Sequence, residues 1–142
     1  MAIILDFNPI EFFGRKKVQP ATIEGRWILT DYKWVQTDRV NNSTSGGYAS
    51  FSAYDSEYYM EFRQGFECSL QLPSSAVLED SYDKKGHYSL NVNKNAVSIR
   101  LDKQIIKFAL LCLTDDTMQL YWTDGDKQLT TEEFFIFTRK NQ

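Results

Sequence analysis

From Trp27 onward, apolar and polar residues alternate along much of the chain with a period of two, which is the pattern of β-strands with one buried face. The clearest run is 66–72, where two Leu, one Phe and one Cys share a face opposite Glu, Ser and Gln. Runs 88–92 and 97–101 alternate in the same way, and the asparagines between them predict a tight turn. These runs predict antiparallel strands joined by hairpins.

The other predicted strands differ in how clearly they alternate. Run 104–113 is apolar on both faces, so we expect a central strand covered on both sides. Further strands are expected over 27–35, 48–54, 57–63, 117–123 and 133–139. Polar residues and turn formers predict long loops over 36–47, 73–85 and 124–131.

Eight or nine short antiparallel strands without a long amphipathic helix predict an all-β, up-and-down barrel over residues 21–142. Eight strands leave an interior large enough for side chains or for one small ligand. Residues 1–20 are expected to form a separate helical segment and connector. Asn8, Pro9 and Glu11 predict a short helix there, because they fit a capped N-terminus.

Composition supports a β-rich globular protein and narrows its partners. Aromatic residues make up 15% of the 142 residues, and such residues favour pleated, half-buried surfaces. The net charge of −3 provides no basic field for nucleic acid. No secretory signal or membrane span is visible, so we expect a cytoplasmic protein, or a periplasmic one if a leader was removed. Cys68 and Cys112 fall in apolar strand patterns and are expected to be buried thiols, although a disulfide between them stays open.

Candidate chemistry is sparse, so we expect no enzyme activity, no metal and no cofactor. His87 is the single histidine, and a zinc site needs clustered His and Cys. Residues 124–126 read Asp-Gly-Asp, but the glycine and glutamate spacing of an EF-hand loop is missing. The adjacent acids Glu132 and Glu133 point to opposite faces of a strand and are interpreted as solvated.

The chain resembles the lipocalin-like (calycin) group over about residues 23–140. The likeness rests on Gly25-Arg26-Trp27, the G-x-W pattern of the first strand, and on Arg139, where lipocalins pack a late basic residue over that tryptophan. Residues 86–88 and 113–120 resemble the short lipocalin-like domains of Bacteroidetes-type bacteria. The resemblance implies a barrel, with Gly25, Trp27 and Arg139 as its structural signature. It does not extend to the Phe-rich N-terminal segment.

Two functions from different classes follow. The first is a non-enzymatic binder of a small apolar ligand inside the barrel, because inward Tyr, Met and Trp side chains commonly line pockets. The predicted ligand-binding residues are Tyr58, Met60, Tyr88, Leu90, Met118 and Trp122. Whether these residues line a cavity or fill the barrel stays open. The alternative is a cytoplasmic protein-interaction module, of immunity or adaptor type, that acts through its surface or through the N-terminal segment.

Overall fold

The protein is described by a computed structural model that covers residues 22–140 of the chain. The predicted N-terminal helix lies outside these residues. Within them, nine strands and two short 3-10 helices, η1 (Gln64–Phe66) and η2 (Val92–Lys94), follow one another. The strands are β1 (Gly25–Asp38), β2 (Ser43–Ser50), β3 (Tyr59–Arg63), β4 (Glu67–Gln71), β5 (Lys84–Asn91), β6 (Ala96–Arg100), β7 (Ile105–Leu113), β8 (Thr117–Gly125) and β9 (Leu129–Arg139).

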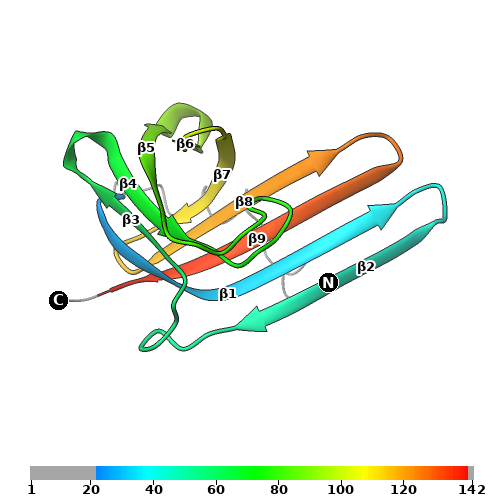
Figure 1. Cartoon of the computed structure of the whole chain (residues 1–142), viewed down its shortest axis with the longest axis horizontal. Coiled ribbons are helices and arrows are strands. Elements are labelled where there is room, and N and C mark those ends of the chain that lie inside the picture. Colours follow the sequence, from blue (N-terminus) through cyan, green and yellow to red (C-terminus); the bar gives the residue numbers. More distant parts are fainter. Residues whose placement is uncertain (1–21, 141–142) are drawn as a thin grey trace.

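Eight of these strands close an antiparallel barrel, and β2 is an extra strand outside it (Figure 1). The barrel runs in the order β1, β3, β4, β5, β6, β7, β8, β9, and β9 pairs back onto β1. Every pair is antiparallel, and most neighbours are consecutive along the chain. The predicted all-β barrel of eight or nine strands is therefore confirmed.

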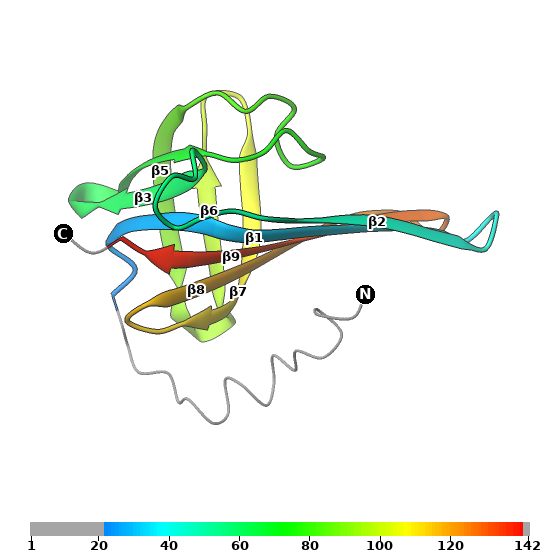
Figure 2. The ribbon, with the colours of Figure 1, turned by 90° about the horizontal axis from the view of Figure 1, so that it is seen from below.

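One flank of the barrel extends into a four-stranded sheet, which we call the arm (Figure 2). The arm consists of residues 31–38, 43–50, 122–125 and 129–135. It starts at an irregularity between Leu29 and Asp31, after which β1 leaves β3 and pairs with β2 instead. The arm gives the molecule a concave face that continues the barrel interior outward.

The arm corrects two loop predictions. Residues 36–47 were expected to form a loop, but β1 continues to Asp38 and β2 begins at Ser43. Residues 124–131 were also expected to form a loop, but β8 ends at Gly125 and β9 begins at Leu129. Both stretches are polar because β2 and the tip of the arm are largely exposed to solvent. Their strands therefore lack the alternation of apolar and polar residues that predicts a half-buried strand.

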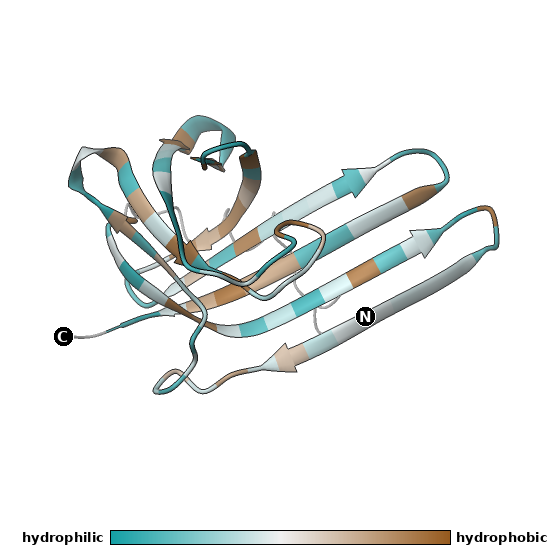
Figure 3. Ribbon diagram, viewed as in Figure 1, coloured by the Kyte–Doolittle hydropathy of each residue, from teal (hydrophilic) through white to brown (hydrophobic). Residues whose placement is uncertain are grey.

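The barrel interior is filled with apolar side chains. Along the strands, hydrophobic and hydrophilic residues often alternate (Figure 3). The largest side chains that are fully buried are Trp27, Phe62, Phe108, Phe135 and Phe137. On β7, one face is buried, whereas Ala109, Leu111 and Leu113 on the other face are only half-buried. The expected cover is therefore complete on one face of the strand and partial on the other.

One end of the barrel is closed by Arg139. Its guanidinium carbon lies 4.2 Å from the ring centroid of Trp27, the residue directly opposite it on β1. Its three nitrogens donate to the carbonyl oxygens of Asp115, Glu24 and Thr22, each at 2.6 Å. The contact implied by the lipocalin resemblance is present, and it leaves the opposite end as the mouth of the barrel.

Candidate functional site

The mouth is covered by the connection between β4 and β5, residues 72–83, which we call the mouth loop. It contacts the turn that precedes β7, because the side-chain amide of Gln104 donates to the carbonyl oxygen of Val77 at 2.8 Å. Arg139 lies at the far end of β7, beside Asp115. The mouth loop and Arg139 therefore lie at opposite ends of the barrel.

The mouth loop inserts two apolar side chains into the barrel. Val77 and Leu78 are each only 2% exposed and belong to the same core cluster as the strand residues. A tight turn presents them, since the backbone N–H of Ser75 donates to the carbonyl oxygen of Leu78 at 2.7 Å. These two residues act as a plug at the end of the barrel that Arg139 does not close.

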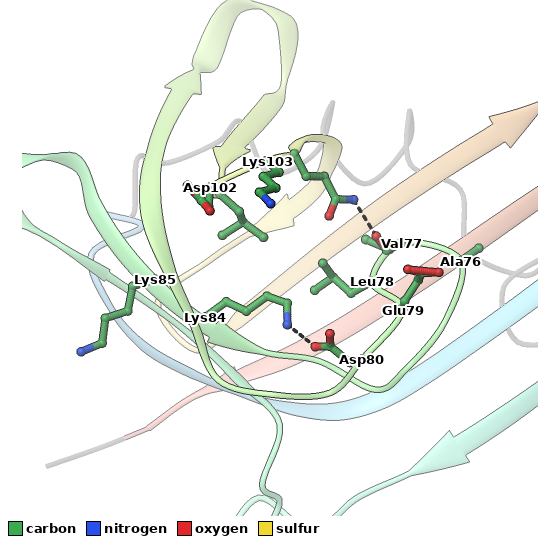
Figure 4. Close-up of a pocket in the computed structure, with 11 residues that line it drawn as sticks. Ala76, Val77, Leu78, Glu79, Asp80, Lys84, Lys85, Asp102 and Lys103 are labelled. Atoms are coloured by element: carbon green, nitrogen blue, oxygen red, sulfur yellow. Dashed lines mark hydrogen bonds and ion pairs between the residues drawn. The ribbon is translucent and has the colours of Figure 1, made fainter.

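A cavity of about 850 Å³ lies beside the plug (Figure 4). It is lined by mouth-loop residues 76–80, by Lys84 and Lys85 at the start of β5, and by the turn 101–104. Its apolar lining comes from Val77, Leu78 and Leu101, and three acids and three lysines surround that lining. An ion pair between Lys84 and Asp80 crosses part of this rim. The cavity suits a ligand with an apolar body and a polar end.

A second cavity, of about 290 Å³, lies between the mouth loop and the concave face of the arm. It is lined by Tyr32, Trp34, Gln36, Thr131 and Glu133 from the arm and by loop residues 74–76. Glu133 is the one charged side chain among the described residues that line it, and this side chain is only 1% exposed. A buried carboxylate beside an open cavity marks this cavity as a second candidate site.

The carboxylate of Glu133 joins the arm to the mouth loop. Tyr32 donates its hydroxyl to Oε1 at 2.9 Å, and the backbone N–H of Ala76 donates to Oε2 at 3.0 Å. Burial, and then the negative charge of Glu133, raise the pKa of Tyr32 well above its usual value. Tyr32 therefore stays protonated and remains a donor to the carboxylate at all ordinary pH values.

The six predicted ligand-binding residues do not gather at either cavity. Met60 and Met118 are fully buried in the core, and Tyr88 is buried with its ring centroid 4.8 Å from that of Phe62. The other three, Tyr58, Leu90 and Trp122, are half-buried and pack against the same core. Their role in binding stays a prediction.

Sequence reasoning missed the residues that matter most at the mouth. Glu133 was interpreted as solvated, which is wrong, because it lies on the inward face of β9 in line with Phe135 and Phe137. That alternation was the available signal. Val77 and Leu78 were placed in a plain connection, although an apolar pair within a polar loop is itself a signal of burial.

The candidate metal and thiol residues show little sign of reactivity. His87 is exposed on β5 and pairs across the sheet with Glu67 and Arg100. Among residues 22–140, no group of three or more His, Cys, Asp or Glu side chains could hold a metal ion. Cys68 and Cys112 are buried without a disulfide between them, and burial raises the pKa of Cys68 to about 11. The described part of the chain contains no helix that could cross a membrane.

The chain matches no protein-family model and no curated protein. Among solved structures, it is similar to apocrustacyanin C2, with a TM-score of 0.48 and 12% identity over 95% of this chain and 70% of that chain. It is also similar to lobster apocrustacyanin A1, with a TM-score of 0.48 and 13% identity over the same shares of the two chains.

Proposed function

We propose that the protein is a non-enzymatic binding protein that takes a small, mostly apolar ligand at the mouth of the barrel, with the mouth loop as a cover. One observation carries the proposal. The end of the barrel opposite Arg139 is sealed by the side chains of Val77 and Leu78, which come from a loop rather than from a strand. A loop can move away from a barrel at far lower cost than a strand, because fewer backbone hydrogen bonds hold it.

The proposed ligand enters through the cavity of about 850 Å³ and contacts Val77, Leu78 and Leu101. That volume lies within the range of small-molecule sites. Two contacts hold the loop shut in the free protein. The side chain of Gln104 donates to Val77, and the backbone N–H of Ala76 donates to Glu133. The proposal includes the absence of enzyme activity, a cytoplasmic location and a relation to the short Bacteroidetes-type domains.

Titration with the apolar dye Nile red, followed by its fluorescence, tests the proposal. The wild-type protein is expected to bind the dye saturably with micromolar affinity. Leu78→Ala shortens the plug and is expected to strengthen dye binding at least severalfold. The dye must displace the plug side chains from the core, and alanine makes fewer core contacts than leucine, so less free energy is lost. Gln104→Ala removes one of the two loop contacts and is expected to speed association.

Leu113→Ala is the matched control, because Leu113 is a half-buried leucine at the other end of β7. It is expected to leave dye affinity at the wild-type value. If Leu113→Ala strengthens binding as much as Leu78→Ala, the dye detects general loosening of the core, and the mouth is not the site. If no variant binds saturably, the proposed function is wrong.

A second candidate function, protein interaction, is favoured by the open edge of β2. Within the described residues this strand pairs only with β1, so its other edge has unpaired backbone groups. The strand is SerThrSerGlyGlyTyrAlaSer, mostly exposed, with no charge and no proline to block a neighbour. Natural edge strands usually carry such blocking residues. We infer that β2 of a second copy pairs here, because two neutral, identical edges pair antiparallel across a two-fold axis without charge repulsion.

Sedimentation velocity over a range of concentrations tests this second candidate. The wild-type protein and Ser45→Gln are expected to form dimers, whereas Ser45→Lys stays monomeric because a lysine on an edge strand disfavours pairing. Ser45 is exposed, so neither change disturbs the core. A wild-type protein that is monomeric at all concentrations would contradict self-pairing at β2.

A further inference from the structure

Glu133 is a buried charge whose partners within the described residues are neutral. The ion pairs of residues 22–140 join Arg26 and Arg63 to Glu61, Arg63 to Glu67, and Lys84 to Asp80. None of them includes Glu133, which accepts only from a tyrosine hydroxyl and a backbone N–H. Burying an ionised carboxylate carries a net cost even after the surrounding protein relaxes, and a cation recovers more of that cost than neutral donors do.

Aromatic side chains flank Glu133 on the concave face of the arm. Trp34 of β1 and Trp122 of β8 are its direct cross-strand neighbours. The indole of Trp34 lies against Gly47 of β2, where a Cβ atom would be only 2.4 Å from the indole nitrogen. Glycine at position 47 therefore makes room for this indole at the edge of the cavity, beside Tyr32.

We propose that the cavity of about 290 Å³ beside Glu133 is a binding site for a small organic ammonium ion. This cavity shares only Ala76 with the cavity at the barrel mouth, and its ligand is defined by a positive charge rather than by an apolar body. Each carboxylate oxygen of Glu133 accepts one hydrogen bond and has a lone pair left for an N–H⁺ donor. Tyr32 and Trp34 also line the cavity, and aromatic rings attract cations.

The same features favour an ammonium ion over a metal ion. Calcium requires six to eight oxygen ligands, whereas Glu133 is the single carboxylate that lines the cavity within the described chain. An ammonium group needs only a few acceptors, and the hydroxyls of Ser75 and Thr131 stand at the same cavity. The volume is ample for a small organic ammonium ion with its charged group at Glu133.

Titration with n-butylammonium chloride tests the site, with n-butanol as the neutral match. Binding is followed by NMR at the indole N–H of Trp34 and the backbone N–H of Thr131, because both residues line this cavity and not the one at the mouth. Saturable shifts with n-butylammonium but not with n-butanol are expected. Glu133→Gln keeps one acceptor oxygen, enough for one of the two present donors, and removes the charge, so it is expected to weaken binding at least tenfold.

Glu132→Gln is the matched control, because Glu132 lies next along β9 on the opposite face and also accepts from a tyrosine, Tyr121, at 2.7 Å. It is expected to bind n-butylammonium like the wild type. If Glu133→Gln does not fold, Trp34→Leu replaces it as the test variant, with an expected severalfold loss from the missing aromatic face. Equal binding by the wild type and the folded test variant, or no saturable binding by the wild type, overturns the proposal. Nile red binding is measured in parallel, so that the proposed site at the barrel mouth is tested separately from the ammonium site.

Discussion

Gly25 leaves the space that Arg139 occupies. A Cβ atom at position 25 would lie 2.5 Å from Nη1 of Arg139, and the backbone of Gly25 has φ +128°, a conformation that favours glycine. The guanidinium passes over this glycine to reach the carbonyl oxygen of Glu24 and the ring of Trp27. The three signature residues of the sequence thus form one structural unit that closes the barrel where its first and last strands meet.

Gly25→Ala is expected to destabilise the protein by about 2–4 kcal/mol, from backbone strain and from displacement of the guanidinium. Gly65→Ala is the control, because Gly65 also has positive φ, +80°, but nothing lies within 4 Å of its missing Cβ. It is expected to cost only about 1–2 kcal/mol. Urea unfolding measures both changes, and equal costs would contradict the account of Gly25.

Arg139→Met is expected to destabilise the protein by about 2–3 kcal/mol, because it removes three charge-assisted hydrogen bonds and a cation–π contact. Arg26→Met is the comparison, since Arg26 also lies over a ring, 3.9 Å from the centroid of Tyr59, and pairs with Glu61 in a partly exposed setting. Its expected cost is about 0–1 kcal/mol. A larger loss of stability for Arg26→Met than for Arg139→Met would contradict a special role of Arg139 where the first and last strands meet.

The Gly25 and Arg139 effects are also expected to be non-additive. In the Arg139→Met background, the side chain that a Cβ at Gly25 would meet is shorter and uncharged. Gly25→Ala should therefore cost less there than in the wild type, by about 1 kcal/mol. A double-mutant cycle from urea unfolding measures this coupling. Strict additivity would mean that Gly25 is required only for its backbone conformation.

Alkaline pH is expected to destabilise the fold. Burial raises the pKa of Cys68 to about 11, and burial with a bond to Glu132 raises the pKa of Tyr121 to about 12. Both groups keep their protons in the folded state while the unfolded chain loses them from about pH 9 to 10. Their full contribution to the free energy of unfolding is present below the pKa values of the unfolded chain. It is lost as the pH rises toward the folded-state pKa values, about 11 for Cys68 and about 12 for Tyr121.

Urea unfolding at a series of pH values from about 8 to 11 measures this loss. The Cys68→Ala and Tyr121→Phe variants are each expected to show a shallower decline than the wild type. A free energy of unfolding that is constant across this range would contradict the burial of these groups as the cause. The wild-type Cys68 thiol is also expected to react slowly with a thiol reagent at neutral pH.

Substitution of the predicted ligand-binding residues shows whether the ligand binds at the barrel mouth or at those residues. If Nile red binds at the mouth, Trp122→Ala should leave its affinity within about threefold of the wild type, because Trp122 lies on the arm opposite Glu133. Tyr88→Ala removes a buried ring that packs on Phe62, so it is expected to lower stability more than affinity. Strong loss of dye binding in the folded Trp122→Ala protein would move the ligand toward the arm.

The barrel could be predicted from the sequence because most barrel strands have one face in the core and one in water. Cys68, Leu70 and Leu72 are buried for this reason, and β4 forms at Glu67–Gln71. Phe66 was predicted to share their face, which is wrong, because it lies in η1 and is 64% exposed. The signature residues could be predicted from their resemblance to a known pattern, and the contact between Arg139 and Trp27 is present. Periodicity is informative wherever burial of one strand face decides the conformation.

The arm and the site at Glu133 could not be predicted in this way. Strand β2 is rich in serine and glycine, and it forms because β1 offers a backbone edge and because Gly47 accommodates the indole of Trp34. Glu133 is buried through contacts with Tyr32 and with a loop residue, Ala76, that is 57 positions away in the chain. Alternation with Phe135 and Phe137 indicates that Glu133 faces inward, but the two contacts that hold its carboxylate leave no trace in a single sequence.

The most direct test of the central claim is a backbone-amide NMR titration of the wild-type protein with 1-octanol. The account predicts saturable shifts centred on Val77, Leu78, Leu101 and Gln104, at the mouth loop and the turn that faces it. Shifts confined to the arm and β2, or no saturable shifts at all, would contradict a ligand site at the mouth of the barrel.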